Sequence, residues 1–220
     1  MTPIIIFGTG DIAQLAHYYF SNDSEHQVSA FTVDAEYITM HELYALPVVP
    51  FSEIVRRYPP DRHKLFVALS YAKLNEVRKQ KYLAAKALGY RLVSYVSSRS
   101  TVLTQYPIGE NCFILEDNTI QPFVTIGNNV TLWSGNHIGH HSIIHDHCFI
   151  ASHVVVSGGV EIEESCFIGV NATLRDHIKV GKNCVIGAGA LLLSDAPPEG
   201  VYVGAATERS KVPSTRLRKI

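Results

Sequence analysis

The chain has 220 residues, 46% of them hydrophobic, which is enough for one large domain or two small ones. With 19 Lys and Arg against 20 Asp and Glu, the formal net charge is −1, so a nucleic-acid partner is not expected. The first residues contain neither a basic leader nor a long apolar stretch, so we expect no signal peptide, no membrane insertion and a cytoplasmic location.

The first 95 residues alternate predicted strands with predicted helices. Apolar runs predict strands at residues 3–7, 28–33, 47–49 and 65–69, and helical spacing appears at residues 51–58 and 72–88. Strands alternating with helices predict an α/β domain with a small, Rossmann-like parallel sheet over residues 1–95.

A glycine-containing turn follows the first predicted strand. Gly8-x-Gly10-x-x-Ala13 opens the first helix, and such a turn presents backbone amides at a helix N-terminus to an anion. Asp34, at the end of the second predicted strand, can accept a hydrogen bond from a ribose hydroxyl. We interpret this pattern as nucleotide or nucleotide-sugar binding, with a merely tight turn as the alternative. The domain is too short for the two halves that a dinucleotide cofactor needs.

A repeat of six residues dominates the rest of the chain. Stepping by six from Val96 to Leu192 gives seventeen consecutive Val, Ile or Leu residues. Neither a helix nor a flat strand has this period. A parallel β-helix does, with three hexads per coil, coils stacked at ~4.8 Å and the aliphatic residues inside. Residues 96–220 are therefore predicted to form a β-helix followed by a short C-terminal tail, because the repeat breaks at Pro197-Pro198.

Bends between the short strands need unusual backbone angles, which glycine and asparagine adopt most easily. Asn111, Asn129 and Asn183 are expected in these bends. So are the glycines that follow the aliphatic positions, namely Gly109, Gly127, Gly139, Gly169, Gly181 and Gly187.

Four cysteines support the same repeat. Cys112, Cys148, Cys166 and Cys184 are separated by multiples of eighteen, so they are expected to stack inside the β-helix as small hydrophobic residues. No Cys-x-x-Cys pair is present, and we expect no metal.

Six of the eleven histidines lie within residues 137–153, and none occupies the repeating aliphatic position. For His145, His147 and His153, an outward-facing polar role is as good an explanation as a function. His140 and His141 are the candidate catalytic residues, because a histidine that titrates near neutral pH can accept a proton from an attacking hydroxyl or amine.

Four segments carry a family resemblance: residues 136–142, 149–159, 166–172 and 184–190. Through them, residues 96–204 resemble the hexapeptide-repeat acyltransferases. The whole chain resembles the sugar acyltransferase branch that contains sialic acid O-acetyltransferases and the bacillosamine-pathway N-acetyltransferase. This resemblance implies a left-handed β-helix, a homotrimer, acetyl-CoA bound between adjacent β-helices, and a nucleotide-linked sugar as acceptor in bacterial surface glycan biosynthesis.

The resemblance also implies roles for individual residues on the β-helix. His140 matches the proton acceptor of the family, and His141 stands where the family often has a carboxylate that raises the basicity of the acceptor. Gly158 matches a backbone amide donor to the thioester or the pantetheine arm. Val170 and Ala188 match positions that contact the pantetheine through the backbone.

The resemblance further assigns Gly8, Gly10, Asp11, Asp34 and Tyr71 to the nucleotide-linked sugar. Two positions depart from the family pattern on the cofactor side. Phe149 stands where a family histidine contacts the cofactor, and Gly204-Ala205-Ala206 replaces the usual Gly-x-Pro of the tail.

We therefore expect an acetyl-CoA-dependent sugar acetyltransferase with direct attack of the acceptor. One alternative is a zinc enzyme of the γ-carbonic-anhydrase kind, with ligands among His140, His141 and His145; such an enzyme has no use for a nucleotide-binding domain. The other is a non-catalytic nucleotide-sugar-binding protein. The sequence leaves the sugar and the acylated atom, nitrogen or oxygen, open.

Overall fold

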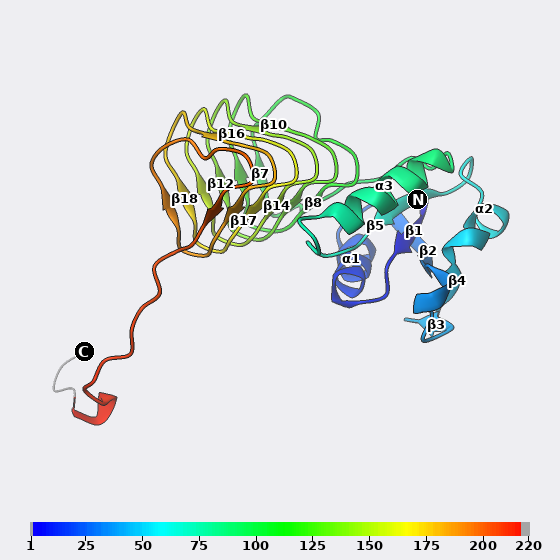
Figure 1. Ribbon diagram of the computed structural model, residues 1–220. Helices are drawn as coiled ribbons and strands as arrows, with labels where there is room; N and C mark the ends of the chain where they lie inside the picture. The colour runs from blue at the N-terminus through cyan, green and yellow to red at the C-terminus, as the bar shows by residue number, and fades with distance from the viewer. Residues whose placement is uncertain (1, 217–220) are drawn as a thin grey trace.

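The computed structural model of the chain describes residues 2–216. An α/β unit stands against the first coils of a long β-helix, and the end of the chain leaves the last coil as an extended tail (Figure 1). No helix among residues 2–216 is both long and apolar enough to cross a bilayer.

The α/β unit contains a five-stranded sheet with the order β3-β4-β2-β1-β5. All neighbours are parallel except β3 and β4, which form an antiparallel hairpin that the sequence analysis did not predict. The strands are β1 (Thr2–Phe7), β2 (His26–Val33), β3 (Glu42–Leu43), β4 (Leu46–Pro50) and β5 (Lys64–Val67). The helices are α1 (Asp11–Asn22), α2 (Ile54–Arg57) and α3 (Glu76–Ala87), with short 3₁₀ turns η1 (Ala35–Tyr37) and η2 (Phe51–Glu53).

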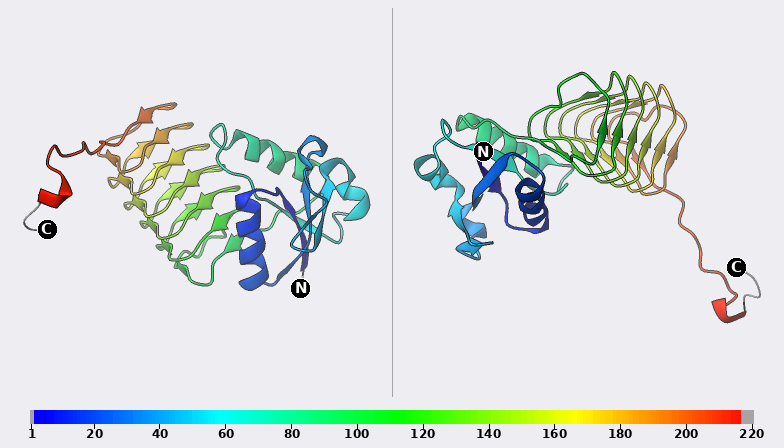
Figure 2. Two further views of the ribbon diagram at one scale, coloured as in Figure 1. Left: turned by 90° about the horizontal axis from the view of Figure 1, so that it is seen from below. Right: turned by 180° about the vertical axis from the view of Figure 1, so that it is seen from behind.

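Helices cover both faces of this sheet. On one face, Phe20 of α1 packs in a core that continues into the β-helix through Phe113. On the other face, Ile54 of α2 and Tyr82 of α3 pack in a second core. Figure 2 shows α1 lying beside the first coils of the β-helix. The two units therefore share buried apolar contacts. The small α/β sheet expected from the sequence is confirmed, with β3 as its one antiparallel strand among the described residues.

Helix α3 begins four residues later than the apolar spacing suggested. Lys73, Leu74 and Asn75 have φ angles of 52°, 53° and 64°, so three consecutive residues are left-handed just before the helix. A contact to the β-helix stabilises this turn, because the buried Asn75 side-chain amide donates to the His147 carbonyl at 2.7 Å. Apolar spacing carries no signal for such a contact.

The β-helix is built of three parallel sheets. The seven-stranded sheet has the order β22-β20-β17-β14-β11-β8-β6, the six-stranded sheet β21-β18-β15-β12-β9-β7 and the four-stranded sheet β10-β13-β16-β19. Within the stacked coils, paired residues are eighteen positions apart, as in Thr131 with Phe149. The predicted left-handed parallel β-helix is confirmed.

Each strand of the β-helix has two residues. They are β6 (Tyr95–Val96), β7 (Thr101–Val102), β8 (Phe113–Ile114), β9 (Thr119–Ile120), β10 (Thr125–Ile126), β11 (Thr131–Leu132), β12 (His137–Ile138), β13 (Ile143–Ile144), β14 (Phe149–Ile150), β15 (Val155–Val156), β16 (Glu161–Ile162), β17 (Phe167–Ile168), β18 (Thr173–Leu174), β19 (Lys179–Val180), β20 (Val185–Ile186), β21 (Leu191–Leu192) and β22 (Val201–Tyr202).

The interior of the β-helix holds the repeating aliphatic residues. From Ile114 to Leu192 every one of them is buried, whereas Val102 in the first coil is 37% exposed. All four cysteines are buried, as predicted. Burial raises the pKa of the Cys112 thiol to about 11, so this side chain behaves as a small apolar group at neutral pH.

From residue 111 to residue 189, every corner of the β-helix places one residue in the left-handed region. Asn111, Asn129 and Asn183 occupy such positions, as predicted. The corner positions are Asn111, Asp117, Phe123, Asn129, Gly135, His141, His147, His153, Gly159, Ser165, Asn171, His177, Asn183 and Gly189.

The glycines that follow the aliphatic residues have a different role. None of them has a positive φ, so the expectation of unusual backbone angles is wrong for these glycines. They are required because the next coil approaches closely. A Cβ on Gly139 would lie 2.6 Å from the Gly158 nitrogen, and a Cβ on Gly169 would lie 2.6 Å from the Ala188 nitrogen.

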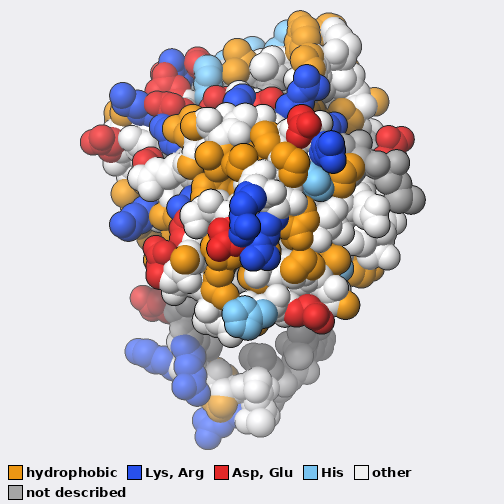
Figure 3. All heavy atoms as spheres, turned by 90° about the vertical axis from the view of Figure 1, so that its right-hand side faces the viewer, with side chains coloured by type: hydrophobic (Ala, Val, Ile, Leu, Met, Phe, Trp, Pro, Cys, Tyr) orange, Lys and Arg blue, Asp and Glu red, His pale blue; other side chains and the backbone are white. Residues whose placement is uncertain are grey.

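Cationic and anionic side chains are intermixed on the end of the molecule formed by the α/β unit (Figure 3). This face therefore offers no continuous surface of one charge to a polyanion.

Candidate functional site

Three edges separate the sheets of the β-helix. The histidine edge lies between the six-stranded and four-stranded sheets and carries Phe123, His141, Gly159 and His177 at its corner positions. The junction edge, with Asn111, Asn129 and His147, separates the four-stranded and seven-stranded sheets. The third edge, called the Val170 edge, lies between the seven-stranded and six-stranded sheets.

His140 and His141 lie together on the histidine edge, both exposed. Their Nδ1 atoms are 3.1 Å apart, and the two rings are almost perpendicular at 86°. The His140 backbone nitrogen donates to Oε1 of Gln121 at 2.8 Å, and the His140 carbonyl accepts from the Gly159 nitrogen at 2.8 Å. The backbone of the predicted base is therefore held by the coil before it and the coil after it.

The ring of His140 lies directly against Gly158. A Cβ added to Gly158 would lie 2.7 Å from both Cε1 and Nε2 of His140, so a side chain at this position would displace the ring. The structure thus brings the predicted base beside the predicted amide donor.

Phe123 supports His141 from the preceding coil. The two ring centroids are 4.6 Å apart with an interplanar angle of 33°. Neither Phe123 nor Gln121 was singled out from the sequence. The eighteen-residue coil could have identified Phe123, since it lies one coil before His141 on the same edge.

Val170 and Ala188 lie one above the other on the Val170 edge, where the Gly189 nitrogen donates to the Val170 carbonyl at 2.8 Å. Both are exposed. Gly204 of the tail passes so close to the Ala188 carbonyl that a side chain on it would collide. The six-stranded sheet separates this edge from the histidine edge, so one chain does not bring Val170 and Ala188 together with His140.

The glycine turn lies at the carboxyl ends of β1 and β5. Gly8 has a φ of 125°, and a Cβ there would lie 2.7 Å from the Ala68 carbonyl oxygen, so only glycine fits. Gly10 and Asp11 line a hollow with residues 68–70, where β2 and β5 flank β1 on opposite sides. Ligands of open α/β sheets bind at such a reversal of strand order.

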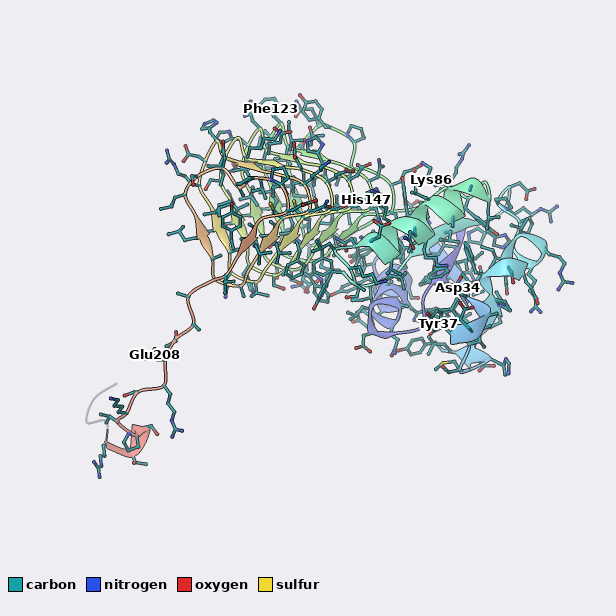
Figure 4. All side chains as sticks on the ribbon, in the orientation of Figure 1. Asp34, Tyr37, Lys86, Phe123, His147 and Glu208 are labelled. Carbon is teal, nitrogen blue, oxygen red and sulfur yellow. The ribbon has the colours of Figure 1, made fainter. Side chains whose placement is uncertain are left out.

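Asp34 follows β2 but faces a different hollow. Its carboxylate forms an ion pair with Nζ of Lys81 at 2.6 Å. The same ammonium lies 5.5 Å from the Phe7 ring centroid and 5.7 Å from that of Phe51. Lys81, which the sequence analysis missed, therefore neutralises the predicted ribose acceptor. Figure 4 shows Asp34 within the α/β unit, far from Phe123 on the histidine edge.

Tyr71 reaches from the loop after β5 to the seven-stranded sheet. Its ring centroid lies 4.9 Å from those of both Phe149 and Phe167, which stack on each other at 5.7 Å and 13°. Trp133 is 6.4 Å from Phe149. Phe149 therefore takes part in an apolar contact between the two units instead of offering a polar atom.

A buried arginine joins the α/β unit to the junction edge. Arg78 of α3 donates from its terminal nitrogens to the carbonyls of Asn129 and Asn111, both at 2.8 Å, and to the Thr131 hydroxyl at 2.9 Å. Burial lowers the pKa of Arg78 to about 10, so the guanidinium stays charged at neutral pH. Arg78 fixes the loop that carries Tyr71 relative to the β-helix.

The remaining histidines of the sequence cluster are dispersed. Nε2 of His145 pairs with Glu161 at 3.0 Å on the four-stranded sheet, and Nδ1 of the buried His147 accepts from the Asn129 side-chain amide at 3.0 Å on the junction edge. His153 occupies a corner of the Val170 edge. Within residues 2–216 of one chain, no three His, Cys, Asp or Glu side chains gather as metal ligands would.

The coils that carry these residues match a known family model. Residues 108–140, 124–158 and 159–194 match the model described as bacterial transferase hexapeptide (six repeats). The matched residues cover most coils of the β-helix. No curated protein matches the chain.

Several solved structures share the hexapeptide β-helix together with the α/β unit. PerB from Caulobacter crescentus, in complex with CoA and GDP-perosamine, is 21% identical with a TM-score of 0.81, covering 93% of this chain and 95% of that one. The acetyltransferase domain of PglB from Neisseria gonorrhoeae FA1090 is 21% identical with a TM-score of 0.77, covering 90% and 94%. WeeI from Acinetobacter baumannii AYE is 20% identical with a TM-score of 0.77, covering 93% and 97%. At this identity the likeness establishes the shared fold of the two units.

Proposed function

We propose that this protein is an acetyl-CoA-dependent acetyltransferase that acylates an amine or hydroxyl of a nucleotide-linked sugar. The observation that carries the proposal is the His140 ring, held against Gly158 on an edge of a hexapeptide β-helix. Solved structures of the same fold contain CoA with GDP-perosamine, or acetyl coenzyme A. We place the reaction in the cytoplasm, in the biosynthesis of a surface polysaccharide or glycan.

The chemistry follows from the position of His140. Its Nε2 removes the proton from the sugar amine or hydroxyl while the nitrogen or oxygen of that group attacks the thioester carbonyl. The developing oxyanion is stabilised by backbone amides such as that of Gly158. The carbon–sulfur bond then breaks, and the CoA thiolate takes a proton as it leaves. No covalent enzyme intermediate is required, which fits four cysteines that are all buried.

The α/β unit, residues 1–95, binds the nucleotide-linked sugar in this proposal. Gly8, Gly10 and Asp11 lie at the reversal of strand order, where helix α1 presents its N-terminal amides to a phosphate. Asp34 binds a ribose hydroxyl while it keeps Lys81 as its counter-ion. Tyr71 lies between this region and the β-helix.

Residues 96–220 bind the acyl donor between two protomers of a homotrimer. His140 and Gly158 lie on one side of the six-stranded sheet, and Val170 and Ala188 lie on the other, so a complete acetyl-CoA groove needs a second copy of the chain. The outward strand residues of this sheet include no Asp, Glu, Lys or Arg, which suits an interface core. They are Thr101, Thr119, His137, Val155, Thr173 and Leu191.

The test is consumption of acetyl-CoA with a panel of nucleotide-linked amino sugars. His140→Ala is expected to lower kcat by ~10²–10⁴-fold, the usual contribution of a general base. His145→Ala, one hexad further on, is the control and should cost much less. A wild-type protein that binds a nucleotide sugar yet never consumes acetyl-CoA would instead favour the non-catalytic alternative.

A further inference from the structure

We propose that His141 is a positioning residue that fixes the tautomer of His140 by accepting a hydrogen bond from its Nδ1. This inference rests on the proposed function, in which Nε2 of His140 takes the proton. The two Nδ1 atoms are 3.1 Å apart, which is within hydrogen-bonding distance.

Two neutral imidazoles can share only one proton between a pair of facing Nδ1 atoms. In one arrangement, Nδ1–H of His140 donates to His141, and Nε2 of His140 keeps a lone pair. In the reverse arrangement, His141 donates, and His140 carries its proton on Nε2, where it can accept nothing. Only the first arrangement gives a base at the nitrogen that lies against Gly158.

The ring of His141 is held where it can act as this acceptor. The Phe123 ring packs against it from the preceding coil with centroids 4.6 Å apart, and the His141 backbone nitrogen donates to the Pro122 carbonyl at 3.3 Å. Turning His141 away would break the contact with Phe123.

The hydrogen bond between His140 and His141 also stabilises His140 after His140 has taken up the proton. When Nε2 of His140 takes the proton, His140 becomes an imidazolium whose Nδ1–H still donates to a neutral acceptor. This bond is then charge-assisted and stronger than in the resting state. His141 therefore supports proton uptake without itself changing protonation.

The decisive variants are His141→Phe and His141→Asn. Phenylalanine fits this corner, since Phe123 has a φ of 66° at the equivalent position one coil earlier. His141→Phe keeps the ring but removes the acceptor, and should lower kcat by about 10- to 100-fold with little change in either KM. Asparagine adopts the left-handed conformation readily and offers Oδ1 as an acceptor, so His141→Asn should retain most of kcat.

His177→Phe is the matched control. His177 has a φ of 57° on the same edge, two coils beyond His141. Its hydrogen bond to the Gly158 carbonyl uses the backbone nitrogen, which the substitution keeps. Its replacement should leave kcat unchanged. Wild-type turnover in His141→Phe, or equal losses in His141→Phe and His141→Asn, would overturn the proposal.

Nitrogen-15 spectra of histidine-labelled protein provide a second reading that does not depend on turnover. Resting His140 should show a protonated Nδ1 and an unprotonated Nε2, and His141→Phe should convert this signal to a mixture of tautomers. A dominant Nε2–H tautomer in the wild type contradicts the inference. If instead the spectra agree while His140→Ala keeps full turnover, the proposed function fails and the hydrogen-bonded pair stands.

Discussion

Histidine occupies left-handed corner positions on all three edges of the β-helix. Asparagine and histidine enter this region more often than most residues with a side chain, so the backbone accommodates them there. His141 faces His140, His147 bonds Asn129, and His153 and His177 lie over glycines of the preceding coil. One backbone position thus supports several different side-chain roles.

A substitution of Asp34 tests whether the α/β unit binds the nucleotide-linked sugar. Asp34→Ala removes the ribose acceptor and should raise the KM for the nucleotide-linked sugar about tenfold, the cost of about one hydrogen bond to a charged group. The KM for acetyl-CoA should not change. Steady-state kinetics with both substrates measure this, and Glu36→Ala in the same hollow is the control. Equal rises in both KM values would show that the α/β unit does not hold the acceptor site.

Arg78 tests how the two units are joined. Arg78→Leu leaves the buried carbonyls of Asn111 and Asn129 without donors, and should lower the free energy of unfolding by about 3 kcal/mol. Arg78→Lys should recover only part of this loss, because an ammonium lacks the planar fork of donors. Chemical denaturation is the measurement, with the exposed Arg56→Leu as control. Equal stability of the Arg78 and Arg56 variants would contradict the role of this contact.

At the scale of elements, the six-residue repeat predicts the structural features that recur in every hexad or every coil. A period of six reports the interior, and a coil of eighteen places Phe123 below His141, so both are readable from the sequence. The Asp34–Lys81 pair and the Arg78–Asn129 contact join segments that are not related by any period. The left-handed turn before α3 depends on a contact with His147 and is equally invisible. The six histidines fall close together in the sequence, yet only His140 and His141 meet.

The end of α1 is tied to the first coil by Asp23. Its Oδ2 accepts from the Ser98 nitrogen at 2.9 Å and the Tyr95 hydroxyl at 2.7 Å. These hydrogen bonds from Ser98 and Tyr95 hold the pKa of Asp23 below its ordinary value. A lowered carboxyl pKa contributes stability that is present above the unfolded-state pKa and is lost as pH falls through the folded-state pKa.

Asp23→Asn should therefore reduce the free energy of unfolding by about 1 kcal/mol at neutral pH. The difference from wild type should shrink as the pH falls below about 4, where the carboxyl of Asp23 becomes protonated in both states. Denaturation curves at several pH values check this, with the surface substitution Asp61→Asn as control. A difference that stays constant down to pH 2 would exclude the ionised carboxylate as its source.

At the scale of the whole molecule, the histidine edge and the α/β unit are separated by the width of the β-helix. Arg78, Asn75 and Tyr71 attach the unit at the junction edge and the seven-stranded sheet, whereas His140 lies on the edge opposite that sheet. Under the proposed function, a sugar held by the α/β unit of one protomer would therefore meet the histidine edge of another. Sequence periodicity describes the fold of one chain and does not predict how protomers are arranged relative to one another.

A substitution of Val155 tests the proposed homotrimer. It is 39% exposed on the uncharged face of the six-stranded sheet, and Val155→Asp would bury a charge in the proposed interface. Sedimentation should change from trimer to smaller species, and turnover should be lost with it. Val55→Asp on α2, where Val55 is 41% exposed, is the matched control and should leave both unchanged. A fully active monomeric wild type would rule out the trimer.

The stacked coils give the β-helix two unequal ends. The α/β unit covers the first coils, while only a tail leaves the last one (Figure 1). Beyond the coils that contact the α/β unit, each coil is bonded to its neighbouring coils, so opening propagates along one dimension and begins where a neighbour is missing. Fraying should start at β22 and β21 and advance towards the α/β unit. The coils that carry His140 and Gly158 lie well inside, so the histidine edge should stay ordered while the coils at the far end open and close.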